Sequence, residues 1–380
     1  MTTKTSTRQP PTTVGIVSTY PPTRCGIARF TASHVEAIRG ADPGIDVHVV
    51  RIVDTPNGAT SPPVTMEFDP ASPVGIRAAA RHLDKMDLAI ISHEFGIFGP
   101  DDGIAVVDLA RSLNVPGLTV LHTVLPEPTG SQLSITRSLA EVTTPVVLCR
   151  SAREMLVSRY GIPDHVIETI PHGAHFSTQP PNEPPHRKLI TWGLLGPGKG
   201  LERAIEALTM LEDLDPPVTY QIVGRTHPNV VRHAGYIYRH KLEALVEDLG
   251  LTDRVEFIDR YVSDDELFGL IREADVVVVP YDNREQVSSG VVTEALGIGR
   301  PVVATRFPYS EEMLETGAGV VVDHDPRSLA EGIRSLIEDP DTYRRAWEAT
   351  THVSERVSWT TVGRQYADLI RELALARATA

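Results

Sequence analysis

Short, continuous runs of apolar residues recur along the chain, separated by segments long enough for helices. Because these runs lack the alternation of a half-exposed strand, they favour strands buried on both faces, as in parallel sheets. In the first half they are Val14–Ser18, Val47–Val53, Leu88–Ser92, Gly117–His122, Pro145–Cys149 and Val166–Ile170. In the second half they are Lys188–Leu195, Thr219–Val223, Val255–Ile258, Asp275–Pro280, Pro301–Thr305 and Gly319–Asp323.

The segments between these runs show the spacing of amphipathic helices. Apolar residues three and four positions apart share one helix face, as in Leu201-Ala204-Ile205-Leu208-Leu211 and Leu242-Leu245-Val246-Leu249. The tail from Ser358 to Ala380 has the same spacing at Val362, Tyr366, Leu369, Ile370 and Leu373. This alternation of strands and helices predicts an α/β protein with parallel sheets and helices on both faces.

One segment near the middle of the chain has no periodicity. Phe176–Arg187 contains four prolines and is typical of a linker. We therefore expect two Rossmann-like, doubly wound domains, at residues 1–176 and 187–359, with a C-terminal helix at 360–380 that packs back on the first domain. Two such domains can place the carboxyl ends of both sheets on one cleft, where ligands of parallel sheets bind.

Composition excludes several classes of protein. The 380 residues include only two cysteines, so a disulfide scaffold and a cysteine-based metal cluster are excluded. The net charge of −14 argues against a nucleic-acid partner and against attraction to anionic lipid. No apolar run approaches the ~20 residues of a membrane span. Met1–Thr13 lacks the apolar core of a signal peptide, which predicts a loose tail and a cytoplasmic protein.

Two strand ends in the second half carry anion-binding signals. The strand Lys188–Leu195 is followed by Gly196–Gly200, whose glycines let backbone amides approach a phosphate while Lys199 adds a charge. The alternative is an ordinary glycine-rich turn, and the spacing is not that of a P-loop. Further on, Ser288, Ser289 and Gly290 open a helix whose first amides can bind an anion, and Glu294 can accept hydrogen bonds from ribose hydroxyls. The alternative there is a capping serine with a solvated glutamate.

Strand ends in the first half carry Gly26 and several polar residues. Gly26 opens a helix and leaves room for a ligand to approach the backbone. Three histidines each follow a different predicted strand: His93 (which is next to Glu94), His122 and His172. In the sequence this pattern resembles a set of three metal ligands. Strand ends lie too far apart for three ligands near 2.1 Å, so we expect no metal. A hydrogen-bonding role at the cleft is expected for His93 and His122, and a structural role for His172.

Taken in order, these motifs resemble the retaining glycosyltransferases of family 4, which have the GT-B fold. The resemblance covers almost the whole chain. It rests on TYPPTRCGIARF, HEFGIFG, the HT after a strand, IPHG, WGLLGPGKGLERAIEAL, QIVGR, EQVSSGVVTEALGIGRPVVAT and GAGVVV. It implies a nucleotide-sugar donor on the C-terminal domain and an acceptor on the N-terminal one.

The resemblance also implies roles for particular residues. Lys199 matches the lysine that binds the donor diphosphate, and Gly26 matches the loop glycine that faces it. Glu294 matches the second glutamate of the Glu-x7-Glu signature, which holds the ribose. His122 matches the residue near the sugar ring, while His93 and Glu94 are expected on the acceptor or sugar side.

The chain departs from the family pattern at two positions. Gln286 stands where the first signature glutamate is expected, and it can still hydrogen-bond sugar hydroxyls. Leu194 stands where a phosphate-binding arginine is expected, and Arg225 after the next strand can compensate. These departures bear on the identity of the sugar and on the level of activity.

The resemblance implies retention without a protein nucleophile, the leaving diphosphate helping to deprotonate the acceptor. Lys199 and the amides at Ser288–Gly290 then stabilise the developing charge, so that no cofactor or metal is required. The pair Asp323 and Asp325 is expected to form a turn into a helix rather than a metal site.

The main expectation is a hexosyltransferase (EC 2.4) that uses a GDP-mannose or UDP-hexose type of donor and a hydroxyl acceptor. Alternatives are a nucleotide-sugar epimerase of the same fold and a catalytically silent sugar-nucleotide-binding subunit. The sequence leaves open the donor base and sugar, the acceptor and the oligomeric state.

Overall fold

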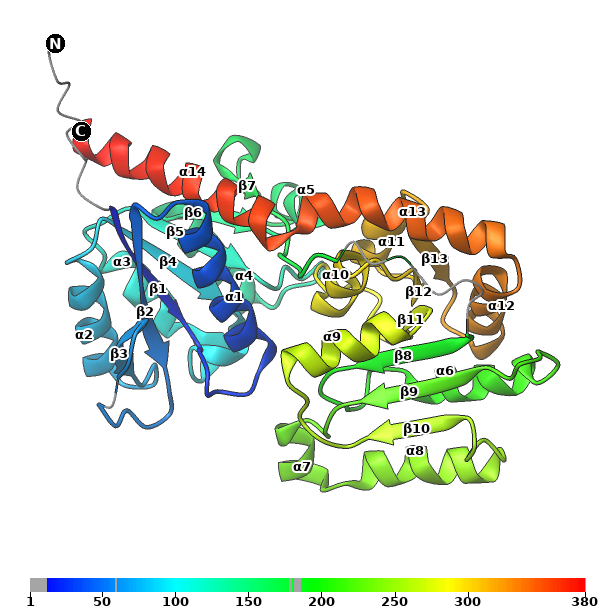
Figure 1. Ribbon diagram of the computed structural model, residues 1–380. Coiled ribbons are helices and arrows are strands. Elements are labelled where there is room, and N and C mark those ends of the chain that lie inside the picture. Colours follow the sequence, from blue (N-terminus) through cyan, green and yellow to red (C-terminus); the bar gives the residue numbers. More distant parts are fainter. Residues whose placement is uncertain (1–11, 59, 178–179, 181–185, 380) are drawn as a thin grey trace, which may run out of the picture. The chain divides into compact units, whose positions relative to one another are not determined.

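The computed structural model describes residues 12–58, 60–177, 180 and 186–379, and it contains two compact units (Figure 1). One unit comprises residues 1–173 and 359–380, and the other residues 174–358. Most of the predicted tail at Met1–Thr13 and most of the predicted linker at Phe176–Arg187 lie outside the described residues.

The N-terminal unit is built on a parallel sheet with the strand order β3-β2-β1-β4-β5-β6-β7. Its strands are β1 (Thr12–Ser18), β2 (Ile45–Ile52), β3 (Val64–Phe68), β4 (Leu88–His93), β5 (Gly117–Leu121), β6 (Thr144–Val147) and β7 (Glu168–Thr169). The order reverses between β1 and β4, which lie side by side. The carboxyl ends of these two strands are therefore where a doubly wound sheet binds ligands.

Helices cover both faces of this sheet. They are α1 (Gly26–Ala41), α2 (Pro73–Leu83), α3 (Ala105–Arg111), α4 (Gly130–Val142), α5 (Arg150–Ser158) and α14 (Trp359–Thr379). Val14 and Ile16 of β1 join a core with α1 and α14, whereas Val17 joins a core with α2, α3 and α4. Neighbouring side chains of one strand thus point to opposite cores, which explains the continuous apolar runs.

The last helix, α14, packs against α1 (Figure 1). A Cβ atom at Gly363 would overlap the carbonyl oxygen of Ala37, so the two backbones come into direct contact at this glycine. Val362, Tyr366 and Ile370 are fully buried in this contact, and they belong to the helix face read from the sequence.

The C-terminal unit has a second parallel sheet, with the order β10-β9-β8-β11-β12-β13. Its strands are β8 (Lys188–Trp192), β9 (Thr219–Val223), β10 (Val255–Ile258), β11 (Val276–Val279), β12 (Val302–Thr305) and β13 (Gly319–Val322). Its helices are α6 (Leu201–Leu208), α7 (Pro228–Ala234), α8 (Ile237–Asp248), α9 (Asp264–Glu273), α10 (Gly290–Gly297), α11 (Pro308–Leu314), α12 (Pro326–Ile337) and α13 (Pro340–Val357). The reversal of strand order falls between β8 and β11.

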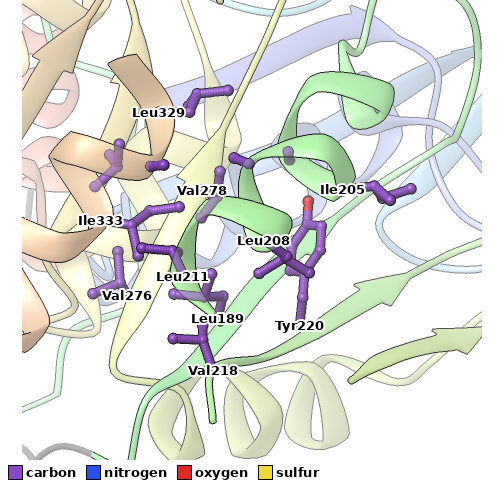
Figure 2. Close-up of a cluster of buried hydrophobic side chains, with 14 of the residues drawn as sticks. Leu189, Ile205, Leu208, Leu211, Val218, Tyr220, Val276, Val278, Leu329 and Ile333 are labelled. Carbon is purple, nitrogen blue, oxygen red and sulfur yellow. The ribbon is translucent and has the colours of Figure 1, made fainter. Parts of the chain in front are cut away.

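The core on one face of this sheet joins strand residues to α6 and α12. Figure 2 shows Leu189 and Tyr220 from the sheet beside Ile205 and Leu208 of α6. Ile333 of α12 completes the cluster and is fully buried. This packing fixes the start of α6, which directly follows the glycine-rich loop after β8.

The structure differs from the predicted strands at the two edges of the first sheet. The strand β3 was not predicted, because as an edge strand it carries Glu67, which binds Arg51 of β2. The run Val166–Ile170 was predicted as a strand, but only the two residues of β7 pair, and a 3-10 turn at Asp164–Val166 precedes them. Edge strands are short and polar, which weakens their apolar signal. Among the described residues, no helix is long and apolar enough to cross a membrane.

Candidate functional site

The candidate donor-site residues gather at the carboxyl ends of β9, β8 and β11. These strands are consecutive neighbours in the sheet of the C-terminal unit, and the strand order reverses between β8 and β11. Lys199 follows β8, Arg225 follows β9, and Gln286 to Glu294 follow β11. The topology therefore brings these residues to one edge of one sheet, at its switch point.

The loop after β8 is held against the loop after β11. The amide of Asp282 donates to the carbonyl of Gly198 at 2.9 Å, and Arg203 of α6 donates to the carbonyl of Pro280 at 2.8 Å and pairs with Asp282. Gly200 has a φ of +63°, and a Cβ atom there would overlap the Pro280 carbonyl oxygen. Glycine is therefore required at this position by both conformation and space.

Lys199 extends over an aromatic ring. Its Nζ lies 4.1 Å from the centroid of Tyr281, which follows β11 and is 2% exposed. The Tyr281 ring stacks in turn on Phe307 at 6.0 Å. A cation over the face of a tyrosine ring is attracted by the π electrons. The ammonium group of Lys199 is thus held beside the switch point.

Arg225 lies in the loop after β9, which pairs with the loop after β8. The amide of Leu195 donates to the Arg225 carbonyl at 2.8 Å, while the exposed guanidinium group lies 5.7 Å from the ring of Tyr261. Leu194 is half-buried. The backbone of Arg225 is therefore adjacent to the glycine-rich loop.

The helix α10 begins as the sequence predicts. Ser289 is its N-cap, and its Oγ accepts from the amide of Val292 at 3.3 Å, while Gly290 is the first helical residue. Thr293 donates to the Ser289 carbonyl at 2.9 Å and contacts the Tyr309 hydroxyl at 2.6 Å. The buried hydroxyl of Ser289 serves the helix cap, and the orientation of the helix start is fixed by these contacts.

Gln286 shapes the loop before α10. Its side-chain Nε2 donates to the Ser288 backbone carbonyl at 2.6 Å. The backbone carbonyl of Gln286 accepts from the amide of Tyr309 at 3.2 Å. An amide side chain has two donor hydrogens and two acceptor lone pairs, so this single bond leaves most of its capacity for other partners.

Glu294 lies in α10, close to the chain that enters the unit. Its Oε2 accepts from the backbone amide of His175 at 3.1 Å, and the Nδ1 atom of the His175 ring lies 3.1 Å from Oε1. The Glu294 side chain is 12% exposed. A carboxylate with these contacts is held in one orientation.

In the N-terminal unit, Gly26 is the exposed first residue of α1, directly after the loop that follows β1. A Cβ atom at Gly26 would meet nothing within 4 Å, so packing does not require glycine there. The preceding residue, Cys25, caps the helix: its Sγ accepts from the amide of Ala28 at 3.4 Å. The space at Gly26 is open to a ligand.

His93 is the last residue of β4 and Glu94 follows it, on the other side of the switch point from Gly26. His93 is fully buried, and burial lowers its pKa to about 4, so the ring is neutral at neutral pH. Glu94 accepts a hydrogen bond from Thr123, yet burial still raises the pKa of its carboxyl above the usual range. A carboxyl group in this environment favours its protonated form more than a solvated one does.

His122 lies after β5 within a group of aromatic rings. Its ring centroid is 4.6 Å from that of Phe30, which also contacts His172 at 4.9 Å and Trp359 at 5.3 Å. Burial, reinforced by the nearby histidines, lowers the pKa of His122 to about 3. His172 contacts the Gly173 carbonyl through Nδ1 at 2.7 Å. The structural role expected for His172 stays a prediction.

Asp325 is the N-cap of α12, as expected for the turn into that helix, and its carboxylate accepts from the Ser328 amide at 2.9 Å. Asp323 pairs with Arg306 at 3.7 Å. Within the part of the chain that the structure describes, no three histidine, cysteine, aspartate or glutamate side chains cluster as metal ligands do.

Four residues at these sites were not singled out in the sequence: His175, Tyr281, Arg203 and Thr123. Each contacts a partner that is distant in the sequence, and the separation reaches 119 positions between His175 and Glu294. The spacing of residues along one element carries no information on such pairs. Only the position of His175 beside the IPHG motif could have drawn attention to it.

The C-terminal part of the chain is similar to a known family. Residues 176–353 match the family model described as glycosyl transferases group 1. A D-inositol 3-phosphate glycosyltransferase of Corynebacterium glutamicum (strain R) is 32% identical over 197 residues, which are 50% of this chain and 44% of that protein. A protein of the same name from Arthrobacter sp. (strain FB24) is 26% identical over 342 residues, 83% of this chain and 77% of that protein. The chain thus spans less than half the length of the first of these relatives.

Solved structures match over nearly the whole chain. Anabaena HepE in complex with UDP has a TM-score of 0.73 and 18% identity, and the match covers 95% of this chain and 100% of that one. Sucrose-phosphate synthase from Thermosynechococcus elongatus has a TM-score of 0.72 and 18% identity, with 96% and 100% covered. The chain therefore has the expected GT-B fold, and its residues 176–353 match the model of the glycosyl transferases group 1.

Proposed function

We propose that the protein is a retaining glycosyltransferase that moves a hexose from a nucleotide-diphosphate sugar to a hydroxyl acceptor. The observation that carries this proposal is the contact of the Lys199 loop with the loop after β11, which leads into α10, beside the switch point of the C-terminal sheet. The ammonium group of Lys199 and the backbone amides of a helix start form a site for a diphosphate. The family match and the UDP in the HepE crystal support a nucleotide-sugar donor.

In this proposal the diphosphate binds between Lys199 and the amides at Ser288, Ser289 and Gly290. The Ser289 side chain is occupied by its cap, so the backbone amides contribute rather than the hydroxyl. The exposed guanidinium of Arg225 adds charge from the loop after β9. Lys199 and the amides are positioned before the reaction, and together with Arg225 they stabilise the charge that develops on the leaving diphosphate.

The nucleoside and the sugar are assigned to neighbouring residues. Glu294, a carboxylate held near the start of α10, accepts hydrogen bonds from the ribose hydroxyls. Gln286 contacts hexose hydroxyls through the part of its amide that the Ser288 bond leaves free. Gly26, His93, Glu94 and His122 of the N-terminal unit are assigned to the diphosphate, sugar and acceptor side of the reaction.

The proposed reaction needs no protein nucleophile. The bond from the anomeric carbon to the diphosphate breaks, the acceptor oxygen bonds to that carbon on the same face, and the acceptor proton passes to a diphosphate oxygen. His122 is neutral because burial lowers its pKa to about 3, so it can serve as a hydrogen-bonding partner without adding charge. Lys199 and the α10 amides carry the phosphate charge, so we propose that no metal is required.

The test is a transfer assay with the full chain. Radiolabelled UDP-glucose and GDP-mannose are incubated with hydroxyl acceptors, including inositol phosphates, which the names of the relatives suggest. We expect an acceptor glycoside with the anomeric configuration of the donor, assigned by NMR coupling constants, and an unchanged rate in EDTA. Inverted products, or strict dependence on Mn²⁺ or Mg²⁺, would overturn the corresponding part of the proposal.

A second candidate is a silent sugar-nucleotide-binding subunit. The bond from Gln286 to the Ser288 carbonyl favours it, because a side chain that shapes the loop can be retained without catalysis. The same assay separates the two, since a silent subunit binds the donor and yields no product. An epimerised donor would instead point to the epimerase alternative.

A further inference from the structure

The carboxylate of Glu294 is bound by a residue that lies outside the family motifs. His175 provides two groups: its backbone amide donates to Oε2 at 3.1 Å, and its ring Nδ1 lies 3.1 Å from Oε1 and 3.3 Å from Oε2. Both oxygens of the carboxylate are therefore engaged from one side. Glu294 itself is 9% exposed, so this contact takes place in a largely dry environment.

The backbone of His175 is fixed relative to α10. The preceding residue, Ala174, donates to the Val357 carbonyl at 2.8 Å and is fully buried. On the other side, Ser177 donates to the Gly297 carbonyl at 3.1 Å. A Cβ atom at Gly297 would lie 2.5 Å from the His175 carbonyl oxygen, so this glycine allows the segment to lie directly on the helix.

The imidazole ring is oriented as well. It packs on Phe268 of α9, with ring centroids 4.2 Å apart and an angle of 41° between the ring planes. This contact and the Glu294 carboxylate together restrict both side-chain torsions of His175. The ring is still 38% exposed, so its substitution leaves no large cavity.

We propose that His175 is a positioning residue for Glu294, which holds the carboxylate ready to accept the ribose hydroxyls of the donor. This inference rests on the proposed function of Glu294. A carboxylate accepts about four hydrogen bonds, so those from His175 leave lone pairs for a ligand. A side chain fixed before binding loses less conformational entropy when the ligand arrives.

The Nδ1–H group can donate in the neutral ring as well as in the charged one, so a neutral donor at the same place replaces it. The amide nitrogen of asparagine can occupy the place of Nδ1, whereas that of glutamine reaches the place of Nε2. His175→Asn and His175→Gln are thus a matched pair that differs in the position of one donor. Both variants keep the backbone amide that donates to Oε2.

The experiment measures binding of UDP and GDP to the full chain by calorimetry, together with their 2′,3′-dideoxy analogues. For the nucleotide that binds, we expect His175→Gln to weaken affinity by ~10-fold and His175→Asn to stay within about threefold of wild type, because a hydrogen bond to a charged group is lost only in the first. The dideoxy analogue lacks the hydroxyls that Glu294 would bind, so both variants should bind it like the wild type.

Other outcomes overturn the inference in distinguishable ways. Equal weakening of the nucleotide and its dideoxy analogue by His175→Gln would show a general structural role, and a parallel loss of melting temperature would agree with it. Unchanged affinity in both variants would show that His175 does not act through Glu294. If the wild type binds neither UDP nor GDP, the proposed function fails, and this inference fails with it.

Discussion

The ammonium nitrogen of Lys199 and the ring of Tyr281 are 4.1 Å apart, although the two residues follow different strands. This contact joins the loop after β8 to the loop after β11 at the switch point of the sheet. We predict that Tyr281→Leu lowers transfer activity by ~5-fold, because a cation–π contact of about 1 kcal/mol is lost. Tyr281→Phe keeps the ring and is the control. Equal activity of all three proteins would show that the contact does not position Lys199.

Lys199 itself is predicted to stabilise the charge on the leaving diphosphate. Lys199→Ala should lower kcat by ~10²-fold or more, as for other lost contacts to transition-state charge. The melting temperature should change little, since the side chain is partly exposed. Lys199→Arg keeps the charge and serves as the control. Activity of the alanine variant within about threefold of wild type would contradict the assignment.

Gly26 and Gly200 give opposite predictions for the same substitution. Gly200→Ala should destabilise the protein by more than ~1 kcal/mol, because φ is +63° and the new Cβ overlaps the Pro280 carbonyl. Gly26→Ala meets nothing within 4 Å, so its unfolding transition should match that of wild type while activity falls. Denaturant titration and the transfer assay measure both effects. Full activity of Gly26→Ala would contradict the assignment of Gly26 to the donor site.

Gln286 stands at a position where the expected Glu-x7-Glu pattern has a glutamate. Gln286→Ala should lower kcat/KM for the sugar nucleotide by ~10-fold and leave the affinity for the bare nucleotide unchanged, because a polar partner of the sugar is lost. Gln286→Glu should be tolerated better, since it restores the usual residue. If Gln286→Ala also weakens binding of the bare nucleotide, its bond to the Ser288 carbonyl matters more than contact with the sugar.

The buried histidines of the N-terminal unit predict acid sensitivity. Burial lowers the pKa of His34 to about 3, against ~6.5 in an unfolded chain, so the unfolded state gains a proton as pH falls below ~6.5. The stability due to the neutral ring is complete above that pH and is lost between pH 6.5 and 3. In His34→Leu the free energy of unfolding should therefore fall less steeply as pH decreases over this range. The slope, measured by urea unfolding, should change by as much as ~1.4 kcal/mol per pH unit. An unchanged slope would contradict this.

The sequence allowed the central strands of both sheets to be predicted, because they are buried on both faces and continuously apolar. It did not reveal β3, a short edge strand whose Glu67 interrupts the apolar pattern and pairs with Arg51 of β2. The start of α10 could be predicted from the sequence, because a serine that caps the helix and a glycine lie next to each other in the chain. Partners such as His175 and Tyr281 could not be predicted, because their contacts depend on how distant elements pack.

The strand order of the second sheet has a consequence for how the protein is made. β8, β9 and β10 are synthesised first, yet β8 lies in the middle of the finished sheet and pairs with β11 on its other side. Until residues 276–279 leave the ribosome, Leu189 and Ile190 of β8 lie on an open strand edge. Exposed apolar edges recruit strands from other chains. Fragments that end before β11 should thus aggregate rather than fold, and the Lys199 loop forms only once translation has passed β11.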